Sequence, residues 1–162
     1  MLGKIVVFGI ALILLVSGTT PVAAQEEGRG WVSPGLRLGY RFGDDGGFFL
    51  GVECSFMHMF QWSPSMHAVG AVVSVDGFAP GLRFQIGAQY SAGIAGTALG
   101  YSYLQKEGKS EHGYFGSLYT FIGIMPYLAF EEYPDRQDGP DIEAGALLKA
   151  PLKVYGPTIK IF

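Results

Sequence analysis

The sequence predicts an all-β fold: an antiparallel, up-and-down β-barrel of about eight strands that spans a membrane. The first observation is that apolar and polar side chains alternate with a period of two along several short segments. The second is the composition, with 25 glycines and 15% charged residues, whereas soluble domains average about 25% charged residues. The third is that no apolar run after residue 24 is long enough for a membrane-spanning helix. A β-barrel is the class that is both apolar and alternating.

Residues 1–24 are predicted to be a secretory signal peptide. Lys4 precedes an apolar run at residues 5–16, and the small residues Val22, Ala23 and Ala24 follow. This run is shorter than the roughly 20 residues of a membrane-spanning helix. We expect cleavage after Ala24, which leaves residues 25–162 as a single barrel domain. A buried helix is the alternative interpretation of the run.

The charge balance excludes a basic nucleic-acid surface. The full chain has 11 basic and 14 acidic residues. Removing residues 1–24 takes away Lys4 alone, so the mature net charge is 10 − 14 = −4. Cys54 is the single cysteine, so no internal disulfide is possible. We expect Cys54 to be a buried thiol on a strand, with a reactive or intermolecular cysteine as the alternative.

Residues 35–53, GLRLGYRFGDDGGFFLGVE, are predicted to form the first hairpin, from a strand at 31–42, a turn at 43–47 and a strand at 48–60. One face of the first arm is apolar and comprises Leu36, Leu38, Tyr40 and Phe42. The opposite face comprises Arg37, Gly39 and Arg41. Folding the hairpin about Asp45 places Phe42 opposite Phe48 and Arg37 opposite Glu53.

The next strands are expected at residues 66–75, at 82–90 and up to Tyr103, with 91–96 either a turn or the beginning of the fifth strand. In the fourth strand one face is apolar and comprises Leu82, Phe84, Ile86, Ala88 and Tyr90. The other face comprises Arg83, Gln85, Gly87 and Gln89. The loop at 105–113 is the most charged stretch, so we expect it to be exposed to solvent.

The last three strands are expected at residues 114–125, 142–149 and 153–162. Pro126 limits or bends the first of them, because proline cannot donate to the backbone ladder. The charged segment 131–141 is predicted to be a connection, and Ala150 and Pro151 form a short turn.

The polar faces contain glycine, glutamine, serine and arginine, which suit the crowded interior of a narrow barrel. An arginine left unpaired there costs several kcal/mol. We therefore predict an internal polar network of Arg37, Arg41, Glu53, Arg83 and Gln85. An ordinary solvated face is the alternative. Four aromatic residues are predicted to lie at the membrane–water interface: Trp31, Trp62, Tyr90 and Phe162. The two tryptophans among them are expected at the same rim of the barrel.

Several features of the sequence together resemble a known class. They are the leader ending at Ala24, the strands GLRLGYRF and GLRFQIGAQY, the aromatic strand ends and the final Phe162. They are similar to the small eight-stranded outer-membrane β-barrel proteins of Gram-negative bacteria, which include OmpA-type and OmpX-type barrels. The resemblance implies an outer-membrane location, contact with outer-membrane lipid, and recognition of the C-terminal strand by the assembly machinery.

Two features depart from that class. Counting back by twos from Phe162 gives Lys160, Thr158, Gly156 and Val154, a less hydrophobic face than the class uses as its assembly signal. In addition, the connection at 131–141 falls on the periplasmic side by this strand count, whereas the long loops of such barrels lie outside.

The histidines do not predict a catalytic or metal site. His58 and His67 lack a carboxylate or thiolate at ligand spacing, and His112 lies in the charged loop. His112 and Ser117 do not have the His-x-Ser spacing of outer-membrane lipid hydrolases. We therefore expect neither an enzyme nor a cofactor.

The expected function is a structural or surface-interaction role in the cell envelope, with the surface ligand unspecified. One alternative is a secreted or periplasmic soluble barrel that binds a small apolar ligand inside. A weaker alternative is a lipid-modifying enzyme that uses Ser117 and His112. A pore is not expected, because eight strands enclose only enough space for side chains.

Overall fold

The computed structural model describes residues 29–43, 46–62, 65–79, 81–120, 124–137 and 139–155. Within these ranges the strands are β1 (Arg29–Phe42), β2 (Gly47–Trp62), β3 (Ser65–Phe78), β4 (Gly81–Ala92), β5 (Ala95–Lys106), β6 (Lys109–Thr120), β7 (Met125–Glu132), β8 (Asp141–Lys149) and β9 (Leu152–Tyr155). The predicted signal peptide at 1–24 and Phe162 lie outside these residues.

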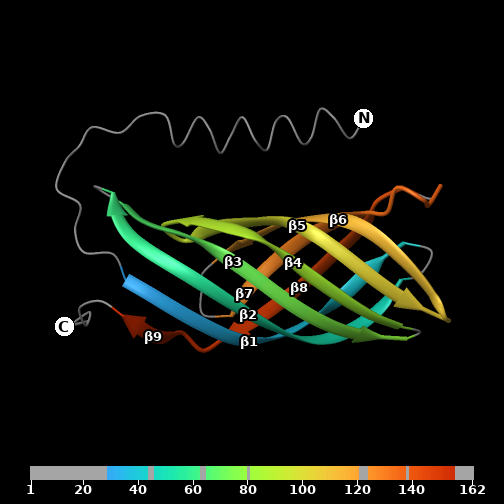
Figure 1. Cartoon of the computed structure of the whole chain (residues 1–162), viewed down its shortest axis with the longest axis horizontal. Helices are drawn as coiled ribbons and strands as arrows, with labels where there is room; N and C mark the ends of the chain where they lie inside the picture. The colour runs from blue at the N-terminus through green and yellow to red at the C-terminus, as the bar shows by residue number, and fades with distance from the viewer. Residues whose placement is uncertain are drawn as a thin grey trace.

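The strands form a closed antiparallel barrel (Figure 1). Each strand from β2 to β7 pairs with the next, and β1 closes the ring by pairing with β2 on one side and with β8 and β9 on the other. Because β8 and β9 share one place beside β1, the wall has eight strand positions. The predicted up-and-down barrel of about eight strands is confirmed.

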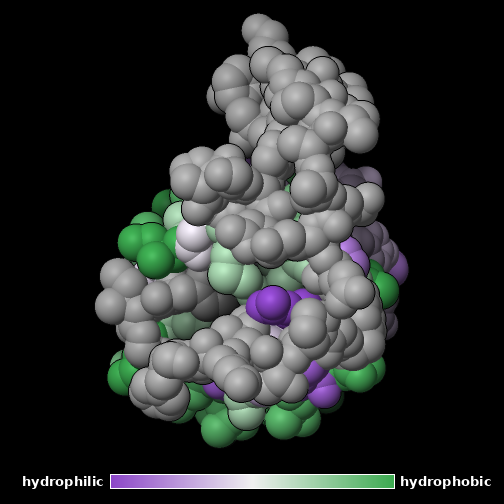
Figure 2. All heavy atoms as spheres, turned by 90° about the vertical axis from the view of Figure 1, so that its left-hand side faces the viewer, coloured by the Kyte–Doolittle hydropathy of each residue, from purple (hydrophilic) through white to green (hydrophobic). Residues whose placement is uncertain are grey.

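The outer face of the barrel is apolar and the inner face is polar. On β1, Leu38 is 46% exposed while its neighbour Arg37 is 5% exposed, and the same alternation continues around the wall. Viewed from the end where β1 begins, hydrophobic side chains lie along the edge of the outline and a hydrophilic group lies near its centre (Figure 2). An apolar surface of this extent exceeds what a water-soluble monomer exposes. The fold is therefore that of a small barrel of the outer-membrane type. The described residues include no helix long and apolar enough to cross a membrane.

The predicted register of the first hairpin is wrong by two residues. Phe48 pairs with Tyr40 instead of Phe42, and Arg37 pairs with Gly51 instead of Glu53. The hairpin is centred one residue earlier than Asp45. Since a shift of two residues preserves which face each side chain occupies, the expected facing of both arms is unchanged.

The predicted strand count near Pro126 is also wrong. The expected strand at 114–125 divides into β6, which ends at Thr120, and β7, which begins at Met125. Pro126 is the second residue of β7, near the beginning of the strand, where a missing N–H is tolerated. The expected last two strands then share the eighth wall position as β8 and β9.

This correction changes the end of the barrel at which the long connection lies. The chain between β7 and β8 spans residues 133–140, and it projects from the end opposite the start of β1 (Figure 1). It therefore lies at the same end as the β1–β2, β3–β4 and β5–β6 turns. The three connections at the other end are short, as the resembled class requires.

Side chains fill the interior of the barrel. One part is a hydrophobic cluster that comprises Phe49, Val72, Ala98, Phe115, Tyr119, Met125, Tyr127, Ala129 and Leu147. The rest of the interior is polar and charged. A hollow of about 20 Å³ beside Arg37 and Gln89 has room for roughly one water molecule. No channel follows from a space of this size.

Candidate functional site

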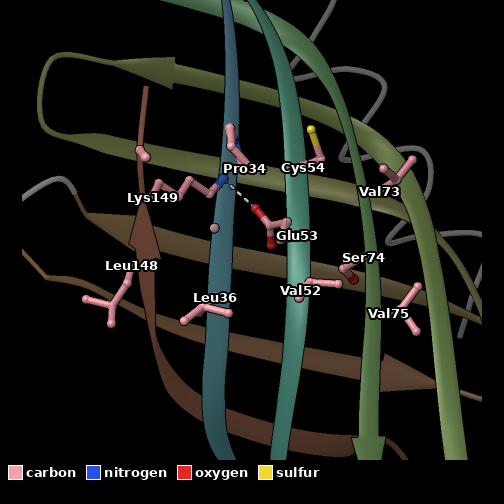
Figure 3. Close-up of a pocket in the computed structure, with 12 residues that line it drawn as sticks. Pro34, Leu36, Val52, Glu53, Cys54, Val73, Ser74, Val75, Leu148 and Lys149 are labelled. Carbon is pink, nitrogen blue, oxygen red and sulfur yellow. Dashed lines mark ion pairs between the residues drawn. The ribbon is translucent and has the colours of Figure 1, made fainter. Parts of the chain in front are cut away.

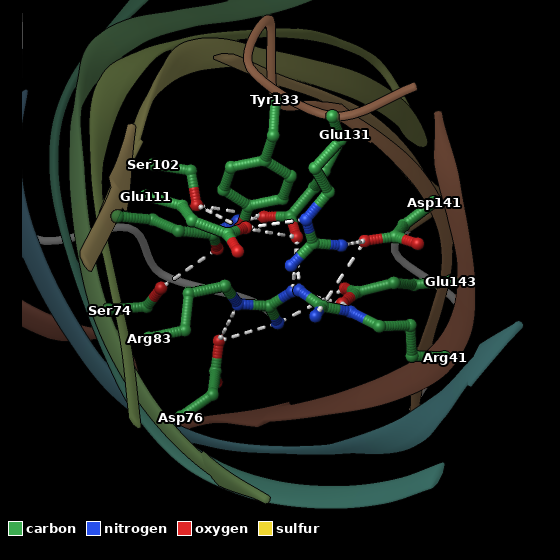
Figure 4. Close-up of polar contacts among 12 residues, drawn as sticks. Arg41, Ser74, Asp76, Arg83, Ser102, Glu111, Glu131, Tyr133, Asp141 and Glu143 are labelled. Atoms are coloured by element: carbon green, nitrogen blue, oxygen red, sulfur yellow. Dashed lines mark hydrogen bonds and ion pairs between the residues drawn. The ribbon is translucent and has the colours of Figure 1, made fainter. Parts of the chain in front are cut away.

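Three buried arginines form the positive half of a charged network inside the barrel. Arg37 and Arg41 lie four residues apart on β1, so both side chains point to the same face of the strand. Arg83 enters from β4 and is fully buried. Viewed along the barrel, Arg41 and Arg83 converge near its centre (Figure 4).

The negative half of this network consists of carboxylates from three other strands. Asp76 on β3, Glu131 on β7 and Glu143 on β8 are each fully buried. The Nε and Nη2 atoms of Arg83 lie 3.1 Å and 2.7 Å from Oδ2 of Asp76. Its Nη1 atom lies 2.7 Å from Oε2 of Glu131 and also donates to Glu143. The guanidinium of Arg83 on β4 thus contacts carboxylates from three other strands, β3, β7 and β8.

Arg41 shares two of these partners. It donates through Nη2 to Glu131, and its Nε atom lies 3.3 Å from Oε1 of Glu143. Its Nη1 atom also lies 3.7 Å from Oδ2 of Asp141. Removing ions from water costs several kcal/mol each unless opposite charges and hydrogen bonds compensate. The shared glutamates supply that compensation to Arg41 and Arg83.

Arg37 connects this network to neutral polar groups. Its Nη1 atom donates to Oγ of Ser74 at 2.8 Å and to the side-chain oxygen of Gln85. It also lies 3.3 Å from Oδ2 of Asp76. The guanidinium carbon is 5.1 Å from the centroid of the Tyr127 ring, within the range of a cation–π contact.

Two hydroxyl groups complete the hydrogen bonds of Glu131. Ser102 donates to Oε1 at 3.1 Å, and the phenol of Tyr133 donates to Oε2 at 3.2 Å. Tyr133 follows the last residue of β7 and is buried. Burial, assisted by the charge of Glu131, raises the pKa of the Tyr133 phenol. The phenol therefore remains a hydrogen-bond donor near neutral pH.

A second cluster lies nearer the end of the barrel where β1 begins. The ammonium of Lys149 pairs with Glu53 and donates to Oγ of Ser55 at 2.6 Å. Ser55 lies 3.2 Å from the side-chain oxygen of Gln89. Nε of Arg37 is 3.8 Å from Oε2 of Glu53, so the second cluster continues into the first.

The structure brings together the five residues proposed for the internal network. All are buried, and each contacts another member of the network; they are Arg37, Arg41, Glu53, Arg83 and Gln85. Sequence reasoning missed five charged residues that complete the network, namely Asp76, Glu131, Asp141, Glu143 and Lys149.

These omissions have a local cause. The sequence places Glu131 at the beginning of the charged connection predicted at residues 131–141, because Pro126 follows the strand expected at 114–125. The alternation of Tyr127, Ala129 and Glu131 on one face was the signal that identifies β7. Asp76 was likewise assigned to the end of its strand, although β3 continues to Phe78.

The proposed interfacial aromatics lie in different places. Trp31 is on the inner face of β1 with Ser33, and its indole nitrogen is buried, which differs from the interfacial position predicted for it. Tyr90 is on the outer face of β4, with its hydroxyl 2.7 Å from Nδ1 of His67. The side chain of Trp62 and the whole of Phe162 lie outside the described residues.

Cys54 also differs from the expectation of a buried thiol. It lies on the outer face of β2 and is partly exposed. Even-numbered side chains of this strand point outward, as the exposed Val52 and Phe56 do. The period of two places the thiol on the apolar surface.

The loop between β7 and β8 is tied to the mouth of the barrel by Arg136. Its Nε atom donates to Glu111, and its Nη1 atom lies 3.1 Å from Oδ2 of Asp141. The guanidinium carbon is 4.6 Å from the centroid of the Tyr133 ring. These contacts tie the loop to the ends of β6 and β8.

The described histidines contact aromatic side chains. The ring of Phe60 lies between His58 and His67, with centroid distances of 6.3 Å and 5.8 Å. His112 is on the outer face of β6, hydrogen-bonded to Tyr101, whereas Ser117 is on the inner face. Among the described residues no group of three or more His, Cys, Asp or Glu is arranged to hold a metal ion.

Comparison with known proteins adds only structural resemblances. No family model matches the chain, and no curated relative matches it. A de novo designed transmembrane β-barrel aligns with 78% of this chain and 100% of its own, at 10% identity and a TM-score of 0.42. Neisserial surface protein A aligns with 76% of this chain and 98% of its own, at 12% identity and a TM-score of 0.40. The designed barrel TMB2.3 aligns with 75% of this chain and 94% of its own, at 13% identity and a TM-score of 0.38.

Proposed function

We propose that this chain is a non-enzymatic outer-membrane β-barrel with a structural or surface-interaction role in the cell envelope. The observation that carries the proposal is the polarity of the wall: apolar side chains point outward, and paired charges fill the interior. In a bilayer, the outer face contacts hydrocarbon, and the closed ring of strand pairings supplies backbone hydrogen-bond partners that lipid does not offer.

The proposed role is architectural because, among the described residues, side chains fill the interior of the barrel. Arg41, Arg83 and their carboxylates cross its centre, and Arg136 ties the long loop to the ends of β6 and β8. Contacts with other molecules then fall to the turns and the loop at that end, where the charged residues Lys109 and Glu111 begin β6. Loops on a rigid scaffold are the usual place for such contacts.

The arrangement of Ser55 and Lys149 favours a structural role over catalysis. A serine beside a lysine acts as a nucleophile only when the lysine amine is neutral and can accept a proton. Here the Lys149 side chain is instead engaged in an ion pair with Glu53. Ser55 is also almost fully buried.

The proposal includes two steps of maturation. A signal peptide at residues 1–24 is cleaved after Ala24, and the outer-membrane assembly machinery recognises the C-terminal strand. The lipid of the outer membrane is the partner of the apolar wall. The soluble alternative, a barrel that binds an apolar ligand inside, is disfavoured by the charged interior and by its hollow of about 20 Å³.

Fractionation tests the proposal directly. The full chain is expressed in a Gram-negative host, and inner and outer membranes are separated on a density gradient. We expect the mature protein, beginning at Gln25, in the outer-membrane fraction. A folded barrel should also migrate differently on a gel before and after boiling. Recovery of a folded protein in the soluble periplasmic fraction would contradict the proposal.

A further inference from the structure

A shallow hollow of about 780 Å³ opens in the outer wall of the barrel, across β3, β2, β1 and β8 (Figure 3). Its edges are aliphatic side chains that point outward and are each more than a third exposed: Leu36, Val52, Val73, Val75 and Leu148. Exposed apolar residues also lie beyond the hollow, such as Leu38 and Phe56. The hollow is therefore part of the surface that faces hydrocarbon in a membrane.

Short side chains make the floor of the hollow low. Pro34 and Gly35 on β1, Cys54 on β2 and Ala150 after β8 line it. Gly35 faces the interior with Arg37, and only its backbone reaches the hollow between Pro34 and Leu36. The floor is therefore low because the outward-facing residues there, Pro34, Cys54 and Ala150, are short.

The backbone ladder is interrupted at this floor. Pairing of β1 with β8 ends at Gly35 and Lys149, and pairing with β9 resumes at Val32 and Leu152. Between them the amide of Ala150 donates to the oxygen of Pro34 at 2.9 Å. Proline has no N–H to return the second bond of a regular antiparallel pair.

The charged residues behind the floor neutralise each other. Lys149 extends toward Glu53, and both side chains are less than one-tenth exposed (Figure 3). The hollow therefore offers no uncompensated charge to a lipid headgroup. Its aliphatic edges would instead gain dispersion contacts with an apolar chain, and an empty hollow would forfeit those contacts.

We propose that this hollow seats one acyl chain of a bilayer lipid, which holds an individual lipid molecule against Pro34. The proposal deepens the proposed function and rests on it, because the hollow meets acyl chains only if the barrel lies in a membrane. Continuity with the apolar outer wall identifies the occupant as hydrocarbon, and the low floor makes this place different from the rest of the wall.

Lipid retention tests the seat. The full chain is refolded in vesicles of palmitoyl-oleoyl phosphatidylcholine, extracted in a mild detergent, and analysed by native mass spectrometry for barrels that keep one lipid. Ala150→Leu and Cys54→Leu fill the hollow from different segments. Each is expected to lower the ratio of lipid-bound to free barrel about tenfold. Ala88→Leu, at an exposed alanine on the outer face of β4, is the matched control and should retain the lipid as the wild type does.

Three results would contradict the proposed lipid-binding hollow. They are no retained lipid on the wild type, equal lipid retention by the wild type and both filled variants, or an equal loss of lipid in Ala88→Leu. If one filled variant does not insert, the other still decides the question, because the two substitutions alter different segments. A wild-type chain that fails to enter vesicles contradicts the membrane placement itself. A chain that inserts and keeps no lipid contradicts only the seat.

Discussion

Arg83 and Glu131 are 48 positions apart in the sequence, yet Nη1 of the arginine lies 2.7 Å from Oε2 of the glutamate inside the barrel. Asp76 and Glu143 complete the carboxylates around Arg83, and Arg41 shares Glu131. The interior charges are therefore one connected group. Removing any member leaves its partners buried without full compensation.

Glu131→Gln is expected to destabilise the barrel strongly. The substitution keeps the size of the side chain but removes the charge shared by Arg41 and Arg83. Breaking a buried ion pair by removing one partner costs about 3–5 kcal/mol. The free energy of unfolding, measured by urea titration in vesicles, should fall by that order. Glu132→Gln, at the neighbouring and less buried position, is the control and should change it little.

Leu38→Arg should cost roughly 2–4 kcal/mol if this outward position lies near the bilayer midplane. Leu38→Phe keeps the side chain apolar and is the matched control. The measurement is again the free energy of unfolding in vesicles. Gly39 does not serve as an inward-facing comparison, because a Cβ atom there would lie 2.7 Å from the backbone oxygen of Ala144. Equal tolerance of Arg and Phe at position 38 would contradict the outward facing.

Gly51→Ala should destabilise the barrel because the wall is closely packed at this point. An added Cβ atom would collide with the carboxylate of Asp76 and lie 2.6 Å from the backbone oxygen of Val75. Overpacking of this kind costs typically about 1–3 kcal/mol. Gly47→Ala, where an added Cβ meets no heavy atom within 4 Å, is the control. A similar midpoint of unfolding for both variants would show that the wall at Gly51 can relax.

Arg136→Ala should release the loop at residues 133–140 without unfolding the barrel. The substitution removes the contacts to Glu111 and Asp141 and the cation–π contact to Tyr133. Limited proteolysis of the barrel in vesicles should cleave this loop faster than in the wild type. The wall should remain intact, because the ladders between β7, β8 and β1 are unchanged.

Lys109→Ala is the control for that experiment, since Lys109 is exposed at the turn between β5 and β6. It should leave the cleavage rate of the loop as in the wild type. If Arg136→Ala also left the rate unchanged, Arg136 would not be what holds the loop against the ends of β6 and β8.

The sequence is enough to predict which side chains of each strand point outward and which point inward, because this direction is a local property of the strand. Successive side chains of a strand point to opposite faces, so the alternation at Leu36, Arg37 and Leu38 specifies what points outward and what points inward. The same rule separates Arg83 and Gln85 from their apolar neighbours on β4. No partner strand is needed for this inference, and an error of two residues in register leaves it intact.

Which side chains meet was decided only when the barrel closed. The sharing of one wall position beside β1 by β8 and β9 depends on strands distant in sequence. Closure brings Glu131 and Glu143 to the arginines of β1 and β4. The sequence by itself determined an apolar outer face and a polar inner face. The tertiary structure decided the charge partners, because inward-pointing ions from separate strands become neighbours only when the sheet closes around them.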